Sequence, residues 1–377
     1  MTLFRKLHLW LSVPFGLIIT GICFTGAILV FEKEITEWSN RDLYNVKSIG
    51  ETSIPLDELM PLVAEQVSLD RQIIGVTISN DPGRTYQVHL SQPQRASIYV
   101  DQYTGEVKGQ GERLPFFTTV FRLHRWLMGN PRTEDGKMGM GKLIVGISTL
   151  MFVFVLLSGI VIWWPRNIKM LKNRLSIQWI KGRKRFYYDL HVVGGIYAIV
   201  VLLALSLTGL TWSFPWYKKG FYELFGAEVM EKPRTKNSNP TDTNRIKGMD
   251  FAQWQPVYDK LVEQNPSFSK VMISDGTAQL YPDEWGNQRA ADSYKFLPTT
   301  GEIIDCTPYS KTDKSKKIGG WIYSIHVGIW GGMFSRILTF LAALLGASLP
   351  LTGYYLWMKR HWRLLRKDSA KCRIDEK

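Results

Sequence analysis

The chain has 377 residues and a net charge of +14 at pH 7. Its mean hydropathy of −0.09 resembles that of a soluble protein, but the apolar residues are strongly segregated. Four segments of at least 22 residues contain no Asp, Glu, Lys or Arg: Trp10 to Phe31, Leu143 to Trp164, Val192 to Trp216 and Ile337 to Met358. About 20 apolar residues span a bilayer core, so the chain is predicted to cross a membrane four times. Cytosolic enzymes, collagen-like chains and disordered chains are excluded.

The positive charge is confined to three stretches of the chain. Residues 1–9, 165–189 and 359–377 together hold 18 basic and 4 acidic residues, whereas the remainder holds 29 of each. Basic residues are concentrated in cytoplasmic loops of membrane proteins, so both termini and the loop 165–188 are expected to be cytoplasmic. The same pattern accounts for the charge without nucleic acid, and no nucleic-acid partner is expected. The apolar run of the first span is too long for a cleaved signal peptide.

Between the first and second spans, and again between the third and fourth, the pattern predicts a small α+β domain. In the first segment, residues 55–68 have helical apolar spacing, and strand-like runs follow at 72–79, 85–90 and 96–101. In the second, a helix at 249–264 precedes strand-like runs at 270–274, 277–282 and 292–297. The fold class is therefore a polytopic α-helical membrane protein with four transmembrane helices in two parallel repeats and two periplasmic α+β domains.

In chain order, eleven segments are predicted. They are the cytoplasmic N-terminus 1–9, the first transmembrane helix 10–31, periplasmic domain 32–114, a periplasmic amphipathic segment 115–142, the second transmembrane helix 143–164, the basic cytoplasmic loop 165–188, the third transmembrane helix 189–216, periplasmic domain 217–317, a second amphipathic segment 318–335, the fourth transmembrane helix 336–358 and the cytoplasmic tail 359–377.

The two halves of the chain share internal landmarks. His8 precedes Thr25-Gly26 by seventeen residues, and His191 precedes Thr208-Gly209 by the same interval. The second and fourth spans match at an offset of 194, which aligns Ser158-Gly159 with Thr352-Gly353. Both copies enter from the cytoplasm, so we interpret them as parallel repeats related by an axis along the membrane normal.

Four of the six histidines occupy repeat-related places. His8 and His191 lie about one turn inside the cytoplasmic ends of the first and third spans, and His124 and His326 precede the second and fourth spans at the outer face. The topology thus predicts one histidine pair at each face. Imidazole is a common axial ligand of haem iron, and two imidazoles leave no open position, which is typical of electron carriers. Arg125 and Arg336 are candidates to pair with the propionates of the outer haem.

Simpler interpretations exist for each feature. Interfacial histidines can extend to the membrane surface, aromatic residues form ordinary interfacial belts, and glycines allow helices to pack closely. Polar residues within spans are usually functional, and their repeat-related placement favours haem ligation. The chain has no C-x-x-C-H motif, so any haem is expected to be b-type. His89 and His361 fall outside the pattern: His89 is expected to be structural, and His361, which follows the fourth span among basic residues, is expected to face the lipid headgroups.

These residues resemble the PepSY-associated transmembrane family, and within it the inner-membrane ferric-siderophore reductases of the FoxB type. The motifs that carry the resemblance are R-K-L-H-L-W at Arg5 to Trp10, V-D-x-x-T-G-E-V at Val100 to Val107 with T-G-E-I at Thr300 to Ile303, L-H-R-W-L at Leu123 to Leu127, S-G-x-x-x-W-W-P-R at Ser158 to Arg166 and Y-Y-D-L-H at Tyr187 to His191. The resemblance implies four spans, periplasmic PepSY domains and two b-type haems. Its histidines correspond to His8, His191, His124 and His326. The second PepSY copy departs from the pattern at Phe296-Leu297.

The expected function is transfer of electrons across a bacterial inner membrane by two haem b groups. Quinol or a cytoplasmic reductase would be the donor, and a periplasmic ferric siderophore or other ferric chelate the acceptor. Reduction to Fe(II) weakens the hold of oxygen-donor chelators, so the activity would be that of a ferric-chelate reductase serving iron uptake. The alternative is a membrane-anchored periplasmic PepSY regulatory or binding protein without redox activity. A transporter is a weaker alternative because the spans lack acidic residues and interrupted helices.

Overall fold

The computed structural model describes residues 2–67, 71–92, 96–165, 167, 171, 174–178, 182–229, 250–283 and 285–375. Nine of the 24 residues of the predicted cytoplasmic loop 165–188 therefore lie outside the described residues. The chain divides into two compact units. The helical unit comprises Met1–Glu32, Pro115–Leu224 and Ile325–Lys377, and the sheet unit comprises Lys33–Leu114 and Phe225–Ser324.

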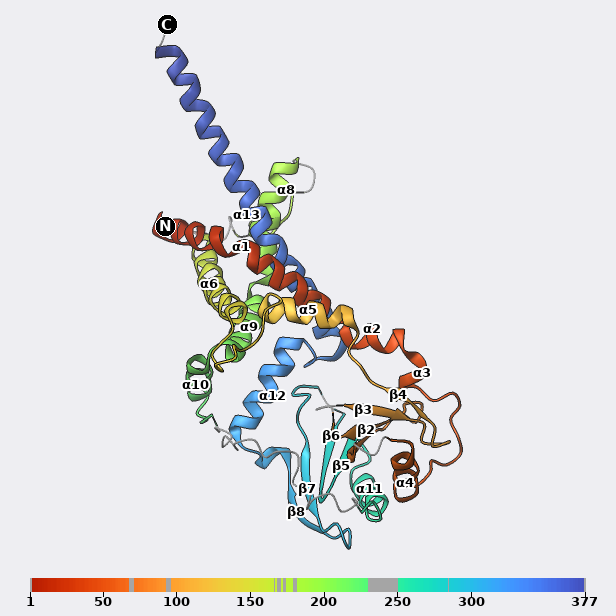
Figure 1. Ribbon diagram of the computed structural model, residues 1–377. Coiled ribbons are helices and arrows are strands. Elements are labelled where there is room, and N and C mark those ends of the chain that lie inside the picture. Colours follow the sequence, from red (N-terminus) through yellow and green to blue (C-terminus); the bar gives the residue numbers. More distant parts are fainter. Residues whose placement is uncertain are drawn as a thin grey trace. The chain divides into compact units, whose positions relative to one another are not determined.

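Four long helices build the helical unit: α1 (Thr2–Val30), α6 (Met140–Trp163), α9 (Gly195–Ser213) and α13 (Gly332–Asp375). Helices α1 and α9 each pack against both α6 and α13, so the four form a closed bundle (Figure 1). The packing contacts are largely apolar, and Ile19, Phe152, Leu202 and Ala342 belong to one buried cluster. All four helices are long and apolar enough to cross a membrane, as the charge-free segments predict.

The long helices extend beyond the predicted spans: α1 begins at Thr2 and α6 at Met140, before the predicted starts at 10 and 143, and the other two extend further. The third is continuous with α8 (Arg183–Asp189) through a π-helical turn, Leu190–Gly194. The fourth was predicted to end at 358, but α13 continues to Asp375, through much of the predicted cytoplasmic tail. Residues 359–375 contain neither Gly nor Pro and are rich in Lys, Arg and Leu, all of which favour helix. Loss of hydrophobicity therefore ends the span there without ending the helix.

Polar bonds tie the bundle together at two proline-containing helices. Pro14 lies within α1 and Pro350 within α13. The Tyr354 hydroxyl donates to the Val13 carbonyl at 2.5 Å, and the Thr20 hydroxyl donates to the Ala347 carbonyl at 3.2 Å. A hydrogen bond inside a membrane has little competition from water, so these bonds help to fix how α1 lies against α13.

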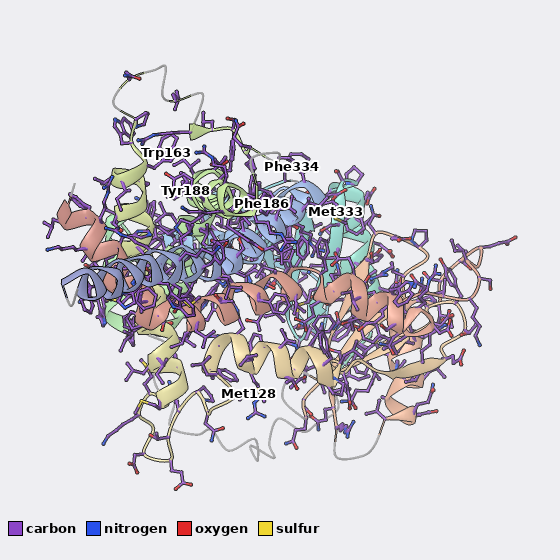
Figure 2. The ribbon with its side chains drawn as sticks, turned by 90° about the horizontal axis from the view of Figure 1, so that it is seen from above. Met128, Trp163, Phe186, Tyr188, Met333 and Phe334 are labelled. Carbon is purple, nitrogen blue, oxygen red and sulfur yellow. The ribbon has the colours of Figure 1, made fainter. Side chains whose placement is uncertain are left out.

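Shorter helices flank the spans: α5 (Pro115–Trp126), α10 (Pro215–Leu224) and α12 (Lys314–Val327). The turn after α5 places Leu127 and Met128 at positive φ, with the Met128 amide donating to the Arg122 carbonyl at 3.2 Å. Met128 is labelled in Figure 2. Met333 and Phe334, in the first turn of α13, expose more than half of their surface (Figure 2). Exposed apolar side chains on a bundle of spanning helices are typical of a surface in contact with lipid.

One antiparallel sheet of eight strands forms the sheet unit, in the order β4-β3-β2-β1-β5-β6-β7-β8. The strands are β1 (Ile73–Ser79), β2 (Tyr86–Leu90), β3 (Ser97–Val100), β4 (Val107–Gln110), β5 (Phe268–Ser274), β6 (Thr277–Pro282), β7 (Asp292–Phe296) and β8 (Ile303–Thr307). The two predicted α+β segments thus contribute four strands each and meet where β1 pairs with β5. At that seam a Cβ on Gly75 would lie 2.8 Å from the Ile273 carbonyl oxygen, so the close pairing requires glycine.

Helices α4 (Leu56–Gln66) and α11 (Trp254–Gln264) pack on one face of the sheet, and both halves of the unit share one hydrophobic core (Figure 1). The core includes Leu59, Val76, Trp254 and Ile273. Strands β4 and β8 were not predicted. Each follows a turn in which glycine adopts positive φ, Gly105 at 73° and Gly301 at 68°, a conformation that glycine adopts without steric cost.

We expect Leu59→Ala to destabilise the sheet unit by about 2–5 kcal/mol, because it removes buried methyl groups and leaves a cavity. Leu59 is 0% exposed on α4, whereas Leu62 on the same helix is 46% exposed. Hydrogen exchange of the strand amides should therefore accelerate in Leu59→Ala and remain close to wild type in Leu62→Ala. Equal exchange in the two variants would mean that α4 does not close this core.

Candidate functional site: two histidine pairs in the helical unit

The structure brings the four predicted histidines together as two pairs. The ring centres of His8 and His191 lie 6.3 Å apart with an interplanar angle of 86°. Those of His124 and His326 are also 6.3 Å apart, at 58°. Within each pair, one ring comes from each half of the chain. The first pair lies near the start of α1, and the second lies toward the other end of the same helix.

At the first pair, both rings are held by a neighbouring helix. His8 Nδ1 lies 3.1 Å from the Val155 carbonyl oxygen and 3.0 Å from the Ser158 hydroxyl, both on α6. His191 Nδ1 lies 3.0 Å from the Leu349 carbonyl oxygen and 3.0 Å from the Thr352 hydroxyl on α13. His191 itself lies in the π-helical turn, a local irregularity often found at functional sites.

At the second pair the same arrangement recurs on the other two long helices. His124 Nδ1 lies 2.9 Å from the Ile22 carbonyl oxygen and 3.2 Å from the Thr25 hydroxyl on α1. His326 Nδ1 lies 3.0 Å from the Leu205 carbonyl oxygen and 3.1 Å from the Thr208 hydroxyl on α9. In all four cases the carbonyl precedes the hydroxyl residue by three positions. We call each such carbonyl and hydroxyl, with the glycine that follows, a cradle.

The cradles determine which nitrogen of each ring carries the proton. A carbonyl oxygen can only accept a hydrogen bond, so Nδ1 must be the N–H donor. Each hydroxyl donates its own proton to a carbonyl of its helix; the Thr208 hydroxyl, for example, is 2.6 Å from the Ala204 carbonyl oxygen. The hydroxyl oxygen is then left to accept from Nδ1–H. With Nδ1 protonated, a neutral ring carries its lone pair on Nε2.

Four glycines complete the cradles by allowing the rings to approach. A Cβ built on Gly26 would lie 3.1 Å from His124 Cε1, and one on Gly209 would lie 3.0 Å from His326 Cε1. The corresponding distances are 3.3 Å for Gly353 to His191 and 3.6 Å for Gly159 to His8. The rings therefore pack directly on helix backbone at three of the four positions.

Burial keeps the second pair uncharged. Desolvation lowers the pKa of His124 to about 4 and that of His326 to about 3; Arg125 lowers both further, and His124 also lowers the pKa of His326. Both rings are therefore neutral near pH 7, which is the form that binds a metal through nitrogen.

Aromatic and basic side chains surround the second pair. The edge of Trp212 packs against His326 with ring centres 4.9 Å apart. The Arg125 guanidinium carbon lies 6.0 Å from the Trp212 ring centre and 5.5 Å from that of Phe121. Arg336 lies in the second turn of α13 and is half-buried. The structure thus connects Arg125 to His326 through Trp212.

The spacing of the rings suits a single metal between each pair. A histidine nitrogen binds a transition metal at roughly 2.0 Å, and its ring centre lies about 1.1 Å further away. Two ligands on opposite sides of one metal therefore place their ring centres roughly 6 Å apart, which agrees with the spacing of both pairs. Among the described residues, no group of three or more His, Cys, Asp or Glu is arranged to hold a metal. A metal held by two imidazoles would take its remaining ligands from another group, and a haem macrocycle is one group that supplies them.

The two remaining histidines lie outside these pairs. His89, in β2, bonds the Thr77 hydroxyl at 2.8 Å through Nε2 and the Ser97 hydroxyl at 3.1 Å through Nδ1. His361 stacks on Trp357 with ring centres 6.0 Å apart. The sequence identified the Ser/Thr-Gly pairs as features of the repeat, but it did not predict that each hydroxyl accepts a hydrogen bond from a histidine. The recurrence of these polar pairs at matching positions within apolar spans could have indicated that they take part in the site.

A bundle of four apolar helices with paired histidines between them defines a multi-pass membrane protein. The family model of the PepSY-associated TM region matches residues 5–360, and the chain belongs to this family. No curated protein matches the chain.

Proposed function

We propose that this protein carries electrons across a bacterial inner membrane through two haem b groups, each held by one histidine pair. One observation carries the proposal: two pairs of imidazoles, 6.3 Å apart, whose Nδ1 atoms are all engaged by helix acceptors. A histidine that only lies at the membrane interface does not require a hydrogen bond from Nδ1 to a neighbouring helix. Ligating histidines regularly have it, because the second hydrogen bond fixes the ring and its tautomer.

In this chemistry the chain would hold the haem groups in place and exclude water from them. Bound haem would supply a one-electron Fe(III)/Fe(II) couple. His8 with His191, and His124 with His326, would hold the two groups, each by a pair of imidazoles. Apolar helix faces around the rings exclude water, and Arg125 is suited to neutralise a propionate near the second pair. Arg336 remains a candidate for the same role, on its position at the start of α13.

The topology follows from the charge distribution. The excess of basic residues in 1–9, 165–189 and 359–377 favours cytoplasmic termini. The His8–His191 pair would then be the inner site and the His124–His326 pair the outer site. Parallel repeats with PepSY-like periplasmic domains account for the equal arrangement of the two halves, in which α5 and α12 supply the outer histidines and α1 and the turn before α9 supply the inner ones.

We further propose that the acceptor is a ferric siderophore or another ferric chelate, and that the donor is quinol or a cytoplasmic reductase. One electron from the outer site would convert chelated Fe(III) to Fe(II). Oxygen-donor chelators bind the softer Fe(II) less tightly, so reduction would release the iron for uptake. The protein would thus be a ferric-chelate reductase.

The test is the number of haems per chain in purified protein. We expect a Soret band that shifts when the protein is reduced by dithionite, and two haems per chain by pyridine-haemochrome assay. His89→Ala and His361→Ala serve as controls that should retain both. Colourless wild-type protein, purified from cells supplied with haem, would instead favour an anchored regulatory protein without redox activity.

A further inference from the structure

We infer that the four cradles are positioning devices that act on the reduction potential of the haem through the histidine Nδ1. The inference rests on the proposed function, because the haem is what responds to the change. Three properties of the cradles support it: the identity of the acceptors, the repetition of the arrangement at all four histidines, and the close packing of the rings against the glycines.

Each histidine Nδ1 has two hydrogen-bond acceptors, whereas packing of the ring between helices would require none. Each ring meets two oxygens of the same helix turn, a carbonyl and a hydroxyl, at 2.9–3.2 Å. A carbonyl in a helix retains a second lone pair after accepting its own backbone N–H. It can therefore accept from the imidazole without loss of the helical bond. The hydroxyl, oriented by its bond to its own helix, provides the second acceptor.

The repetition indicates that the arrangement is not the chance result of packing. The helix that supplies a ring and the helix that supplies its cradle differ at all four positions: α1 with α6, α5 with α1, the π turn with α13, and α12 with α9. Despite these different partners, the carbonyl, the hydroxyl and the glycine keep the same spacing along the chain. Three of the four hydroxyl residues are Thr, and Ser158 serves His8.

Donation from Nδ1–H changes the ligand electronically. As the hydrogen bond strengthens, electron density on Nε2 increases, and the ring becomes a stronger donor to a metal. A stronger donor stabilises Fe(III) more than Fe(II) and lowers the reduction potential. Loss of one of the two acceptors should therefore raise the potential of the haem concerned and leave the other haem unchanged.

The sharpest test replaces Thr208 by valine, which keeps the branched shape and removes the hydroxyl. Redox titration of the purified holoprotein should show that the outer haem is reduced at higher potential, with the inner haem unchanged. Retention of the outer haem should weaken about tenfold, the lower end of the usual range for outer-shell partners, because the Leu205 carbonyl still accepts. Thr208→Ser should restore both properties. Thr352→Val should produce the corresponding change at the inner haem alone.

A matched control lies one turn further along the same helix. The Thr211 hydroxyl donates to the Thr208 carbonyl at 2.7 Å and bonds no histidine, so Thr211→Val should leave both potentials at their wild-type values. If Thr208→Val retains the outer haem at the wild-type potential, the inference fails although the proposed function stands. If wild-type protein binds no haem, the proposed function fails first.

The glycines provide a second test that does not depend on the hydroxyls. Gly26→Ala places a methyl group 3.1 Å from His124 Cε1, whereas Gly21→Ala, on the same helix, meets nothing within 4 Å. We expect the first variant to displace the ring and broaden or shift the absorption and EPR signals of the outer haem. The second should not change them. Identical spectra in the two variants would show that the ring does not depend on this cradle.

Discussion

Replacement of His191 by alanine is expected to yield a protein with one haem in place of two. The ring centres of His191 and His8 lie 6.3 Å apart, and the proposed inner site draws one imidazole from each. Loss of one axial ligand should therefore empty the inner site, while the His124–His326 pair stays intact. The pyridine-haemochrome ratio should halve, and the remaining spectrum should be that of a low-spin, two-histidine haem.

His8→Ala should give the same result, because each pair draws one ligand from each half of the chain. Two controls distinguish ligand loss from general misfolding. His361→Ala removes a ring that stacks on Trp357, and His89→Ala removes one that bonds two hydroxyls in the sheet unit. Both variants should retain two haems. Loss of both haems from folded His191→Ala protein would contradict two separate paired sites.

The positions of the spans could be predicted from the sequence because a lipid environment imposes a simple rule. The charge-free runs of 22 or more residues overlap α1, α6, α9 and α13 over most of their length. The ends of the helices could not be predicted in this way, because a helix can continue beyond the apolar segment that spans the membrane. The segment after Met358 is basic and yet helical. The strands of the sheet unit were predicted where alternation was regular, and β4 (VKGQ) and β8 (IIDCT) were missed because neither alternates apolar and polar residues.

The joining of the two α+β segments into one sheet lay beyond the sequence pattern. Each segment has its own helix and its own strands, which is also what two separate domains would show. The decisive feature is the pairing of β1 with β5, residues almost 200 positions apart. It depends on an edge that is free on each half and on a single glycine, Gly75, where the strands approach.

The histidine pairs followed from the topology, but their cradles did not. Repeat symmetry and the direction of the spans placed His8 with His191 and His124 with His326. The donor–acceptor relation to Ser158, Thr25, Thr352 and Thr208 depends on the rotation of each helix about its axis. An apolar helix such as α6 or α9 presents almost no sequence signal for that rotation, so only three-dimensional packing could reveal it.

Replacement of His326 by alanine is expected to abolish chelate reduction while the inner haem still accepts electrons. In the proposed function His326 would be one of the two ligands of the outer haem, and its ring packs against Trp212 with ring centres 4.9 Å apart. Mutation of a residue that hydrogen-bonds a metal ligand typically lowers metal affinity or activity by about 10–100-fold. Loss of a ligand itself should lower them by more than this. The outer haem would then be absent, and the path from donor to acceptor would be interrupted after the first carrier.

The measurement uses full-length protein in proteoliposomes, with a quinol donor and a ferric hydroxamate chelate as the probe. Formation of Fe(II) is followed with an Fe(II)-specific chromogenic chelator, and reduction of the inner haem is followed by its absorption. His124→Ala should reproduce the His326→Ala result, because the two rings hold the same group, whereas His8→Ala should prevent both signals. Wild-type chelate reduction by His326→Ala protein would remove the outer pair from the path. Retained inner reduction with lost chelate reduction requires the electron to pass the two pairs in series, from His8 and His191 to His124 and His326.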